Sequence, residues 1–154
     1  APVRGEASER QEQINVIFDR RDYTEIFERD LIEANVEIVI ASPGLTRRKA
    51  ERLMELVKAR QEAGVSVTVI TLDPDAEGYE NTIERHILVE EMKNNGIYVR
   101  TTEDESEHYA VIDHEIVWHG GINLLGKEDA WDNLIRVINR QAAAELLEIS
   151  CNVL

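Results

Sequence analysis

The segment Ser106–Asn123, "SEHYAVIDHEIVWHGGIN", decides the fold of this chain. Two short apolar runs, "HYAVID" and "EIVW", meet at Asp113 and His114, and an Asp at such a junction favours a tight turn. The segment therefore predicts an antiparallel β-hairpin that leads into a glycine-rich bend, "GGIN". Three histidines lie in this segment, namely His108, His114 and His119.

Hydrophobic periodicity outside the hairpin alternates between the two-residue period of strands and the 3.6-residue period of helices. Further strands are predicted at residues 14–19, 36–41, 65–72, 97–101 and 133–138. Helices are predicted at residues 23–34, 47–61, 82–96 and 140–149. In the helix at 82–96, Ile83, Ile87 and Met92 are expected to face the core. This order predicts an α/β fold with a mixed sheet, largely parallel, and helices on both faces.

Length and composition favour one domain at residues 14–154, with residues 1–13 as a linker or a boundary remnant. The formal net charge of −14 repels nucleic-acid phosphates and anionic membranes over the surface as a whole. The cluster "TRRK", Thr46–Lys49, is expected to be a solvated first helical turn. No apolar run is long enough to span a bilayer. The single cysteine, Cys151, fits the reducing cytoplasm.

Ligands of such sheets bind beyond the carboxyl ends of the strands. The segments "ASPG" and "LDPD" follow two predicted strands and are expected at that rim. Whether "GGIN" joins them depends on the orientation of the hairpin.

The segments "VEIVIASPGL", "GVSVTVITL", "GIYVRT" and "AVIDHEIVWHGGINLL", in this order, resemble the phospholipase D superfamily from about Ile14 to Glu148. The family signature is His-x-Lys, four residues, Asp, six residues and Gly-Ser-x-Asn. Asp113 has the matching spacing to Gly120 and Asn123, with Gly121 in the place of the serine. The resemblance implies a phospholipase D/nuclease-like fold.

The first half of the signature differs, because the histidine position falls on Ser106 and the lysine position on His108. A start at His108 would instead put Ala110 and Glu115 at the lysine and aspartate positions. In the family, as the resemblance implies, a histidine attacks phosphorus and a second motif copy protonates the leaving oxygen. Lysine and asparagine hold the phosphate, and aspartate orients the histidine.

The expected site therefore comprises motif positions that no longer support catalysis. They are Ser106, His108, Asp113 and Asn123, with Gly120, Gly121 and His119 as binding residues. A two-residue turn would also place His108 opposite His119, within ~5.5 Å between Cβ atoms. Such a pair could bind a metal, but no third ligand has a fixed spacing, so we expect no metal and no cofactor.

These observations favour an inactive accessory module, structural or phosphate-sensing, of a larger protein such as a helicase-type DNA-processing enzyme. One alternative is an active phosphodiesterase or nuclease with His108 or His119 as a displaced nucleophile. Another is a protein-interaction domain with an acidic surface. Expected partners are a second copy of the chain or another domain of the parent protein. Nucleic acid is expected only through that parent, and no membrane is expected.

The apolar segment "VWHGGINLL" is expected to form an exposed patch that a two-fold interface or a missing part of the parent protein covers. The residues expected in this patch are Trp118, Ile122, Leu124 and Leu125.

Overall fold

The computed structural model describes residues 16–76, 81–104, 107–128 and 131–152, so the segment expected to be a linker lies outside them. The described strands are β1 (Ile17–Asp19), β2 (Glu37–Ala41), β3 (Ser66–Leu72), β4 (Tyr98–Thr102), β5 (His108–Ile112), β6 (Ile116–Gly120) and β7 (Asn133–Ile138). The described helices are α2 (Tyr23–Ile32), α3 (Arg47–Glu62), α4 (Thr82–Asn94) and α5 (Arg140–Asn152).

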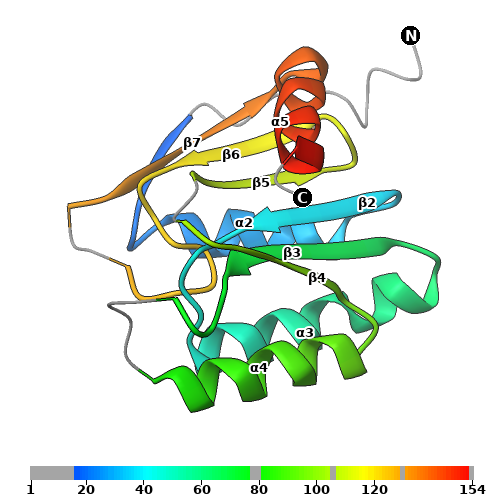
Figure 1. Cartoon of the computed structure of the whole chain (residues 1–154). Coiled ribbons are helices and arrows are strands. Elements are labelled where there is room, and N and C mark those ends of the chain that lie inside the picture. The colour runs from blue at the N-terminus through cyan, green and yellow to red at the C-terminus, as the bar shows by residue number, and fades with distance from the viewer. Residues whose placement is uncertain (1–15, 77–80, 105–106, 129–130, 153–154) are drawn as a thin grey trace, which may run out of the picture.

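The seven described strands form one mixed sheet in the order β1-β7-β6-β5-β2-β3-β4 (Figure 1). β2, β3 and β4 run parallel, and α3 and α4 connect them. β5 pairs antiparallel with β2, and the hairpin, β7 and β1 continue the antiparallel half. The predicted α/β fold with a mixed sheet is therefore confirmed. The expectation that the sheet is largely parallel is wrong, because four of its six described ladders are antiparallel.

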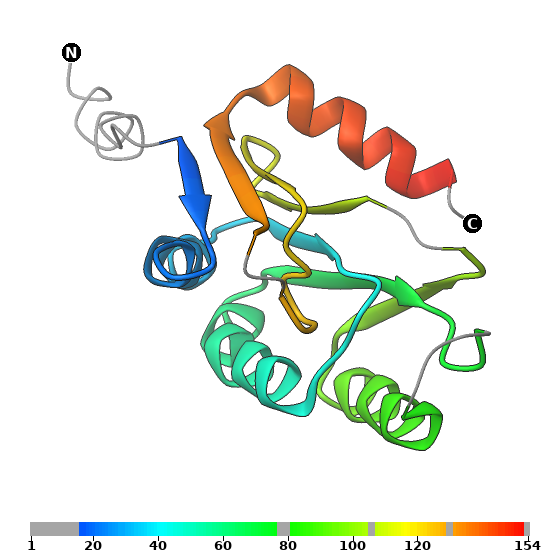
Figure 2. The same ribbon diagram turned by 90° about the vertical axis from the view of Figure 1, so that its left-hand side faces the viewer.

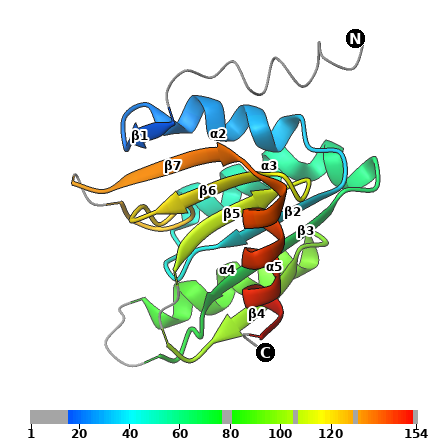
Figure 3. The same cartoon turned by 90° about the horizontal axis from the view of Figure 1, so that it is seen from above.

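The sheet has helices on both faces, as predicted (Figure 2). α2, α3 and α4 cover one face, where the larger hydrophobic core includes Ile38, Ile40 and Trp118. α5 lies across the other face, over β5 and β6 (Figure 3), and packs on a smaller core that includes Val39 and Tyr109. Successive residues of a strand point to opposite faces, so each central strand contributes to both cores.

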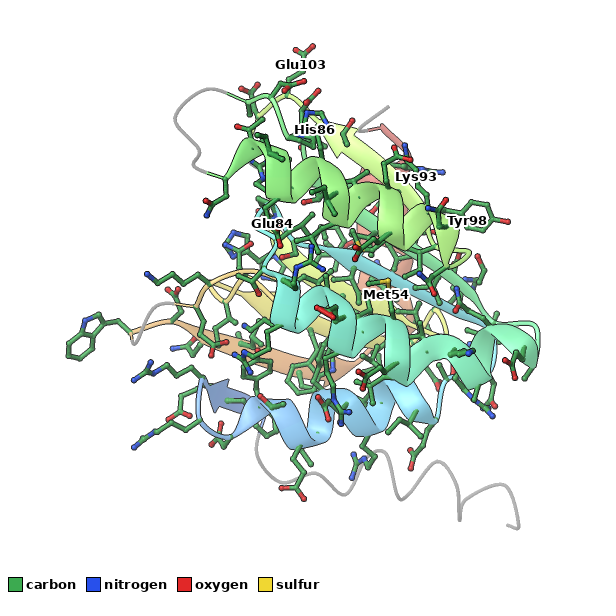
Figure 4. The ribbon with its side chains drawn as sticks, turned by 90° about the horizontal axis from the view of Figure 1, so that it is seen from below. Met54, Glu84, His86, Lys93, Tyr98 and Glu103 are labelled. Atoms are coloured by element: carbon green, nitrogen blue, oxygen red, sulfur yellow. The ribbon has the colours of Figure 1, made fainter. Side chains whose placement is uncertain are left out.

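α3 lies between α2 and α4 (Figure 4). Its start is set by Thr46, whose side chain accepts a hydrogen bond from the backbone N–H of Lys49. The chain then leaves the helix at Gly64, whose φ of +99° favours glycine. Arg47 at the first turn ties α3 to α4, since its Nε lies 2.6 Å from Glu84.

The inward face of α4 differs from the prediction. Met92 is buried as expected, but Ile83 is 78% exposed and Ile87 is also exposed. A step of five residues, from 87 to 92, turns a helix by about 140°, so the expected residues do not share one stripe. The buried stripe is Arg85, Leu88, Val89 and Met92.

The expected apolar patch is wrong, because Trp118, Ile122, Leu124 and Leu125 are all buried in the core of their own chain. The ring of Trp118 packs against those of Phe18 and Phe27, with centroids 5.3 and 5.5 Å away. Residues from β1 and α2 thus cover the surface that a second copy was expected to cover. An exposed apolar patch therefore no longer supports the expected dimer.

Membrane insertion has no candidate segment among the described helices. None of them combines the length and the apolar character that a bilayer span requires.

Candidate functional site

The hairpin has the tight turn that the sequence predicts, but its register differs by one residue. Asp113 and His114 have φ angles of 55° and 58°, and the next ladder pair is Ile112 with Ile116. Glu115 is therefore an extra residue on the second strand, as in a β-bulge. A shift of one residue changes which face each side chain occupies.

The shift separates the two histidines that were expected to face each other. His108 pairs with Gly120, whereas His119 pairs with Tyr109. Because side chains alternate along a strand, His108 shares a face with the larger core and His119 shares the opposite face with α5. His119 instead lies 2.9 Å from Glu107, between Nε2 and Oε2. The predicted histidine pair is therefore wrong.

The bend "GGIN" does join "ASPG" at the sheet rim. The side-chain oxygen Oδ1 of Asn123 accepts a hydrogen bond from the backbone N–H of Gly44 at 2.9 Å. The hydroxyl of Ser42 lies 3.2 Å from the same oxygen and accepts from the N–H of Leu125 at 3.0 Å. These contacts fix the bend against the end of β2. We call Ser42, Gly44, His108, Gly121 and Asn123 the rim site.

His108 stands at the lysine position and is half-buried. Its Nδ1 lies 2.8 Å from the carbonyl oxygen of Gly121. A carbonyl oxygen can only accept, so Nδ1 carries the proton and Nε2 is an acceptor when the ring is neutral. This bond ties the start of β5 to the bend after β6.

Steric crowding explains why glycine occupies positions 120 and 121. A Cβ atom at Gly120 would lie 2.2 Å from the backbone oxygen of Asn133, because β7 passes close to it. A Cβ atom at Gly121 would lie 2.7 Å from Oδ1 of Asp132. The side chain of Asp132 therefore takes the space where the family has a serine.

Asp113 lies at the opposite end of β5 from His108. Its carboxylate accepts hydrogen bonds from the backbone N–H groups of Asn35, Val36 and Glu37, the shortest being 2.7 Å to Val36. The structure thus brings His108, Gly121 and Asn123 together, but places Asp113 at the opposite end of the central strands. Ser106 lies outside the described residues.

A polar cluster beneath the bend was missed from the sequence. Nζ of Lys49 lies 2.5 Å from Oε2 of Glu128 and 3.4 Å from the carbonyl oxygen of Asn123. The hydroxyl of Tyr23 donates to the same carboxylate oxygen at 3.0 Å. Lys49 is only 12% exposed, so the solvated turn expected for "TRRK" holds for its two arginines and not for its lysine. The signal was present, because Lys49 lies four residues before the buried Leu53.

Burial and charge perturb this cluster. Burial, followed by the negative charge of Glu128, raises the pKa of Tyr23 well above its ordinary range. Burial also acts to raise the pKa of Glu128, but the hydrogen bond and charge of Lys49 outweigh it, and the net shift is downward. At neutral pH the site therefore holds a Lys49–Glu128 ion pair and a neutral tyrosine.

The described part of the chain holds no group of three or more His, Cys, Asp or Glu side chains arranged to bind a metal ion.

Solved structures share this fold, whereas no protein-family model and no curated protein matches the sequence significantly. Nuc from Salmonella typhimurium, a phospholipase D family member, superposes with a TM-score of 0.69 at 16% identity, over 89% of this chain and 91% of that chain. NucT from Helicobacter pylori gives a TM-score of 0.63 at 17% identity, over 89% and 92%.

TrmBL2, an archaeal chromatin protein whose structure shows a novel mode of DNA binding, gives a TM-score of 0.57 at 14% identity. That match covers 96% of this chain and 57% of TrmBL2. Identities this low speak to the fold alone. The strand order, the hairpin that ends in "GGIN" and the extent of these superpositions show that this chain has the fold of the phospholipase D superfamily.

Proposed function

We propose that this domain is a non-catalytic member of the phospholipase D superfamily and serves a larger cytoplasmic protein as a structural or phosphate-sensing module. The observation that carries the proposal is the residue set at the motif positions, where Ser106 and His108 replace histidine and lysine. A serine attacks phosphorus poorly unless a general base lies within hydrogen-bond reach. A histidine at position 108 removes the ammonium group that a lysine would bring to a phosphate.

The surroundings of the rim site support a loss of catalysis. The Asp132 carboxylate stands beside Gly121, where it repels an incoming phosphate. Lys49, whose ammonium lies 3.4 Å from the Asn123 carbonyl oxygen, is also bound to Glu128. The oxygen of Asn123 is already used by Gly44 and Ser42.

Two donors remain for weak phosphate binding. The amide nitrogen of Asn123 makes no hydrogen bond to the residues that the structure describes, and Nε2 of His108 becomes a donor when the ring is protonated.

A role inside a larger nucleic-acid-processing protein is the broader part of the proposal. TrmBL2, which shares the fold, is a DNA-binding chromatin protein of which this chain matches little more than half. The net charge of −14 disfavours direct DNA binding by this domain. Contact with nucleic acid would then come from the rest of the parent protein.

A second candidate is an active phosphodiesterase with His108 as a displaced nucleophile. The bond from Nδ1 to Gly121 favours it, because that bond orients the ring and leaves the lone pair of Nε2 unused by it. The two candidates differ in turnover and can be separated directly.

The test is hydrolysis of bis(p-nitrophenyl) phosphate and single-stranded DNA by the purified chain and by His108→Ala. His114→Ala is the matched control, since His114 lies at the far end of the hairpin and contacts Glu37. We expect no turnover above background in any of the three. Turnover that His108→Ala abolishes and His114→Ala retains would refute the proposal and establish the second candidate.

Phosphate sensing is tested by titrating inorganic phosphate while amide NMR shifts are recorded. We expect saturable shifts at Gly121 and at the side-chain amide of Asn123. Their absence would remove phosphate sensing and leave the structural role.

A further inference from the structure

A cavity of about 140 Å³ lies between α2, α3 and the loop that follows Asn123. α2 and α3 run side by side in Figure 4. The apolar wall of the cavity is built from Phe27, Leu31, Leu53, Leu56 and Leu124. An aliphatic cavity of about 150 Å³ holds a benzene ring, so this one is large enough for a small organic ligand.

The lining of this cavity contains three positively charged side chains and two carboxylates. Lys49 pairs with Glu128, and Arg52 forms two hydrogen bonds with Glu28, at 2.9 and 3.1 Å. Arg48, the fifth charged residue of the lining, makes no ion pair with any residue in the described part of the chain. Counted over its lining alone, the cavity therefore has one more cation than carboxylates, although Arg52 also reaches Glu55 outside the lining at 3.5 Å.

The position of Arg48 fits a role at the cavity mouth. Its side chain is exposed, and its charge acts on both Tyr23 and Glu128 at the inner end. An arginine presents two parallel N–H groups that match the two oxygens of a carboxylate.

We propose that this cavity binds a small monocarboxylate with an apolar body, of which benzoate is the simplest representative. The carboxylate pairs with Arg48, and the body packs against the leucines of α2 and α3. This proposal goes beyond the function proposed for the rim site and does not depend on it. The two sites are neighbours, because Leu124 and Leu125 follow Asn123 directly and Lys49 of the cavity lining lies 3.4 Å from the Asn123 carbonyl oxygen.

Other ligand classes fit the cavity less well. A phosphate would gain nothing from the apolar wall, and Lys49 is not available to it while Glu128 holds the ammonium. A neutral alcohol of the same shape would fill the wall but leave Arg48 unpaired. A cation would meet the excess positive charge.

The test is a titration of the full chain with benzoate, followed by the NMR signals of the leucine methyl groups. We expect saturable shifts at Leu53 and Leu56. Arg48→Gln is expected to weaken binding at least tenfold, whereas Lys58→Gln, an exposed cation on the same helix outside the cavity, leaves it unchanged. His108→Ala also leaves it unchanged, which separates this proposal from that for the rim site.

Four results would overturn the proposal. Three are the absence of saturable shifts with benzoate, equal affinity for benzyl alcohol, and an Arg48→Gln variant that binds like the original chain. Inorganic phosphate that shifts the same methyl groups would show a surface anion site in place of a carboxylate cavity.

Discussion

Asp30 of α2 and Arg136 of β7 form a bidentate ion pair, with N–O distances of 2.7 and 2.9 Å and both side chains only 2% exposed. They lie 106 residues apart in the sequence. The indole N–H of Trp118 donates to the same carboxylate at 2.8 Å, and the guanidinium lies 5.9 Å from the centroid of its ring. This cluster fixes α2 against β6 and β7.

Asp30→Asn is expected to lower the free energy of unfolding by about 3–5 kcal/mol, because it removes the carboxylate charge that compensates a buried guanidinium. Urea denaturation measures it. The control is Arg140→Gln, which breaks an exposed ion pair with Glu115 and should cost less than about 1 kcal/mol. Equal effects of the two substitutions would show that the buried pair contributes no more to the free energy of unfolding than an exposed pair does.

Asp113→Asn tests whether this residue acts on the rim site or on the turn before β2. We expect a loss of about 1–2 kcal/mol in the free energy of unfolding, because three backbone N–H groups lose a charged acceptor. Asparagine tolerates the positive φ of this position, so backbone strain should add little. The NMR signals of Val36 should shift while those of the His108 ring stay. A shift of the His108 ring as large as that of Val36 would support an orienting role.

The two glycines of "GGIN" should respond differently to a new side chain. Gly121→Ser meets only the side chain of Asp132, which can rotate, and should cost about 1 kcal/mol or less. Gly120→Ala meets the backbone of Asn133 and should cost about 3 kcal/mol or more, because β7 must move. Thermal unfolding of both variants gives the ranking, and the reverse order would contradict the packing described here. Asp132→Ala should remove the cost of Gly121→Ser.

Glu128 should make the stability of the chain depend on pH in the acid range. Its pKa is lowered in the folded chain, chiefly because the Lys49 ammonium outweighs burial. Its ionised form therefore stabilises the fold above its ordinary pKa of 4.5, and this contribution is lost as the pH falls through the lower folded-state pKa. The difference in unfolding free energy between the original chain and Glu128→Gln should be constant near neutral pH and shrink below pH 4.5. A difference that grows with acid would contradict the assignment.

The order of the elements could be predicted because hydrophobic periodicity is local. The hairpin, its turn at Asp113 and His114, and the bend that ends at Asn123 all lie within one short segment. The register could not be predicted, because it depends on one extra residue, Glu115. The carbonyl of Glu115 accepts from the N–H of Asn139, the residue after β7, and no pattern inside the hairpin reveals this contact.

The prediction of the rim site was right for Asn123 and wrong for Asp113. The spacing from Asp113 to Asn123 predicts one site, but the full length of β6 separates these two residues, and of the two only Asn123 reaches the rim. The burial of Trp118 was also missed. Phe18 and Phe27, which cover it, are about a hundred residues away, a distance at which sequence patterns carry no pairing information.

The pairing of β1 with β7 has a consequence for folding during synthesis of the chain. β1 and α2 are synthesised before β7, so the strand that pairs with β1 and carries Arg136 emerges several seconds later, at about 5–20 residues per second. Until then the Asp30 carboxylate has no Arg136 to meet, and burying it alone would be costly. The buried cluster of Asp30, Trp118 and Arg136 can therefore form only after β7 has been made.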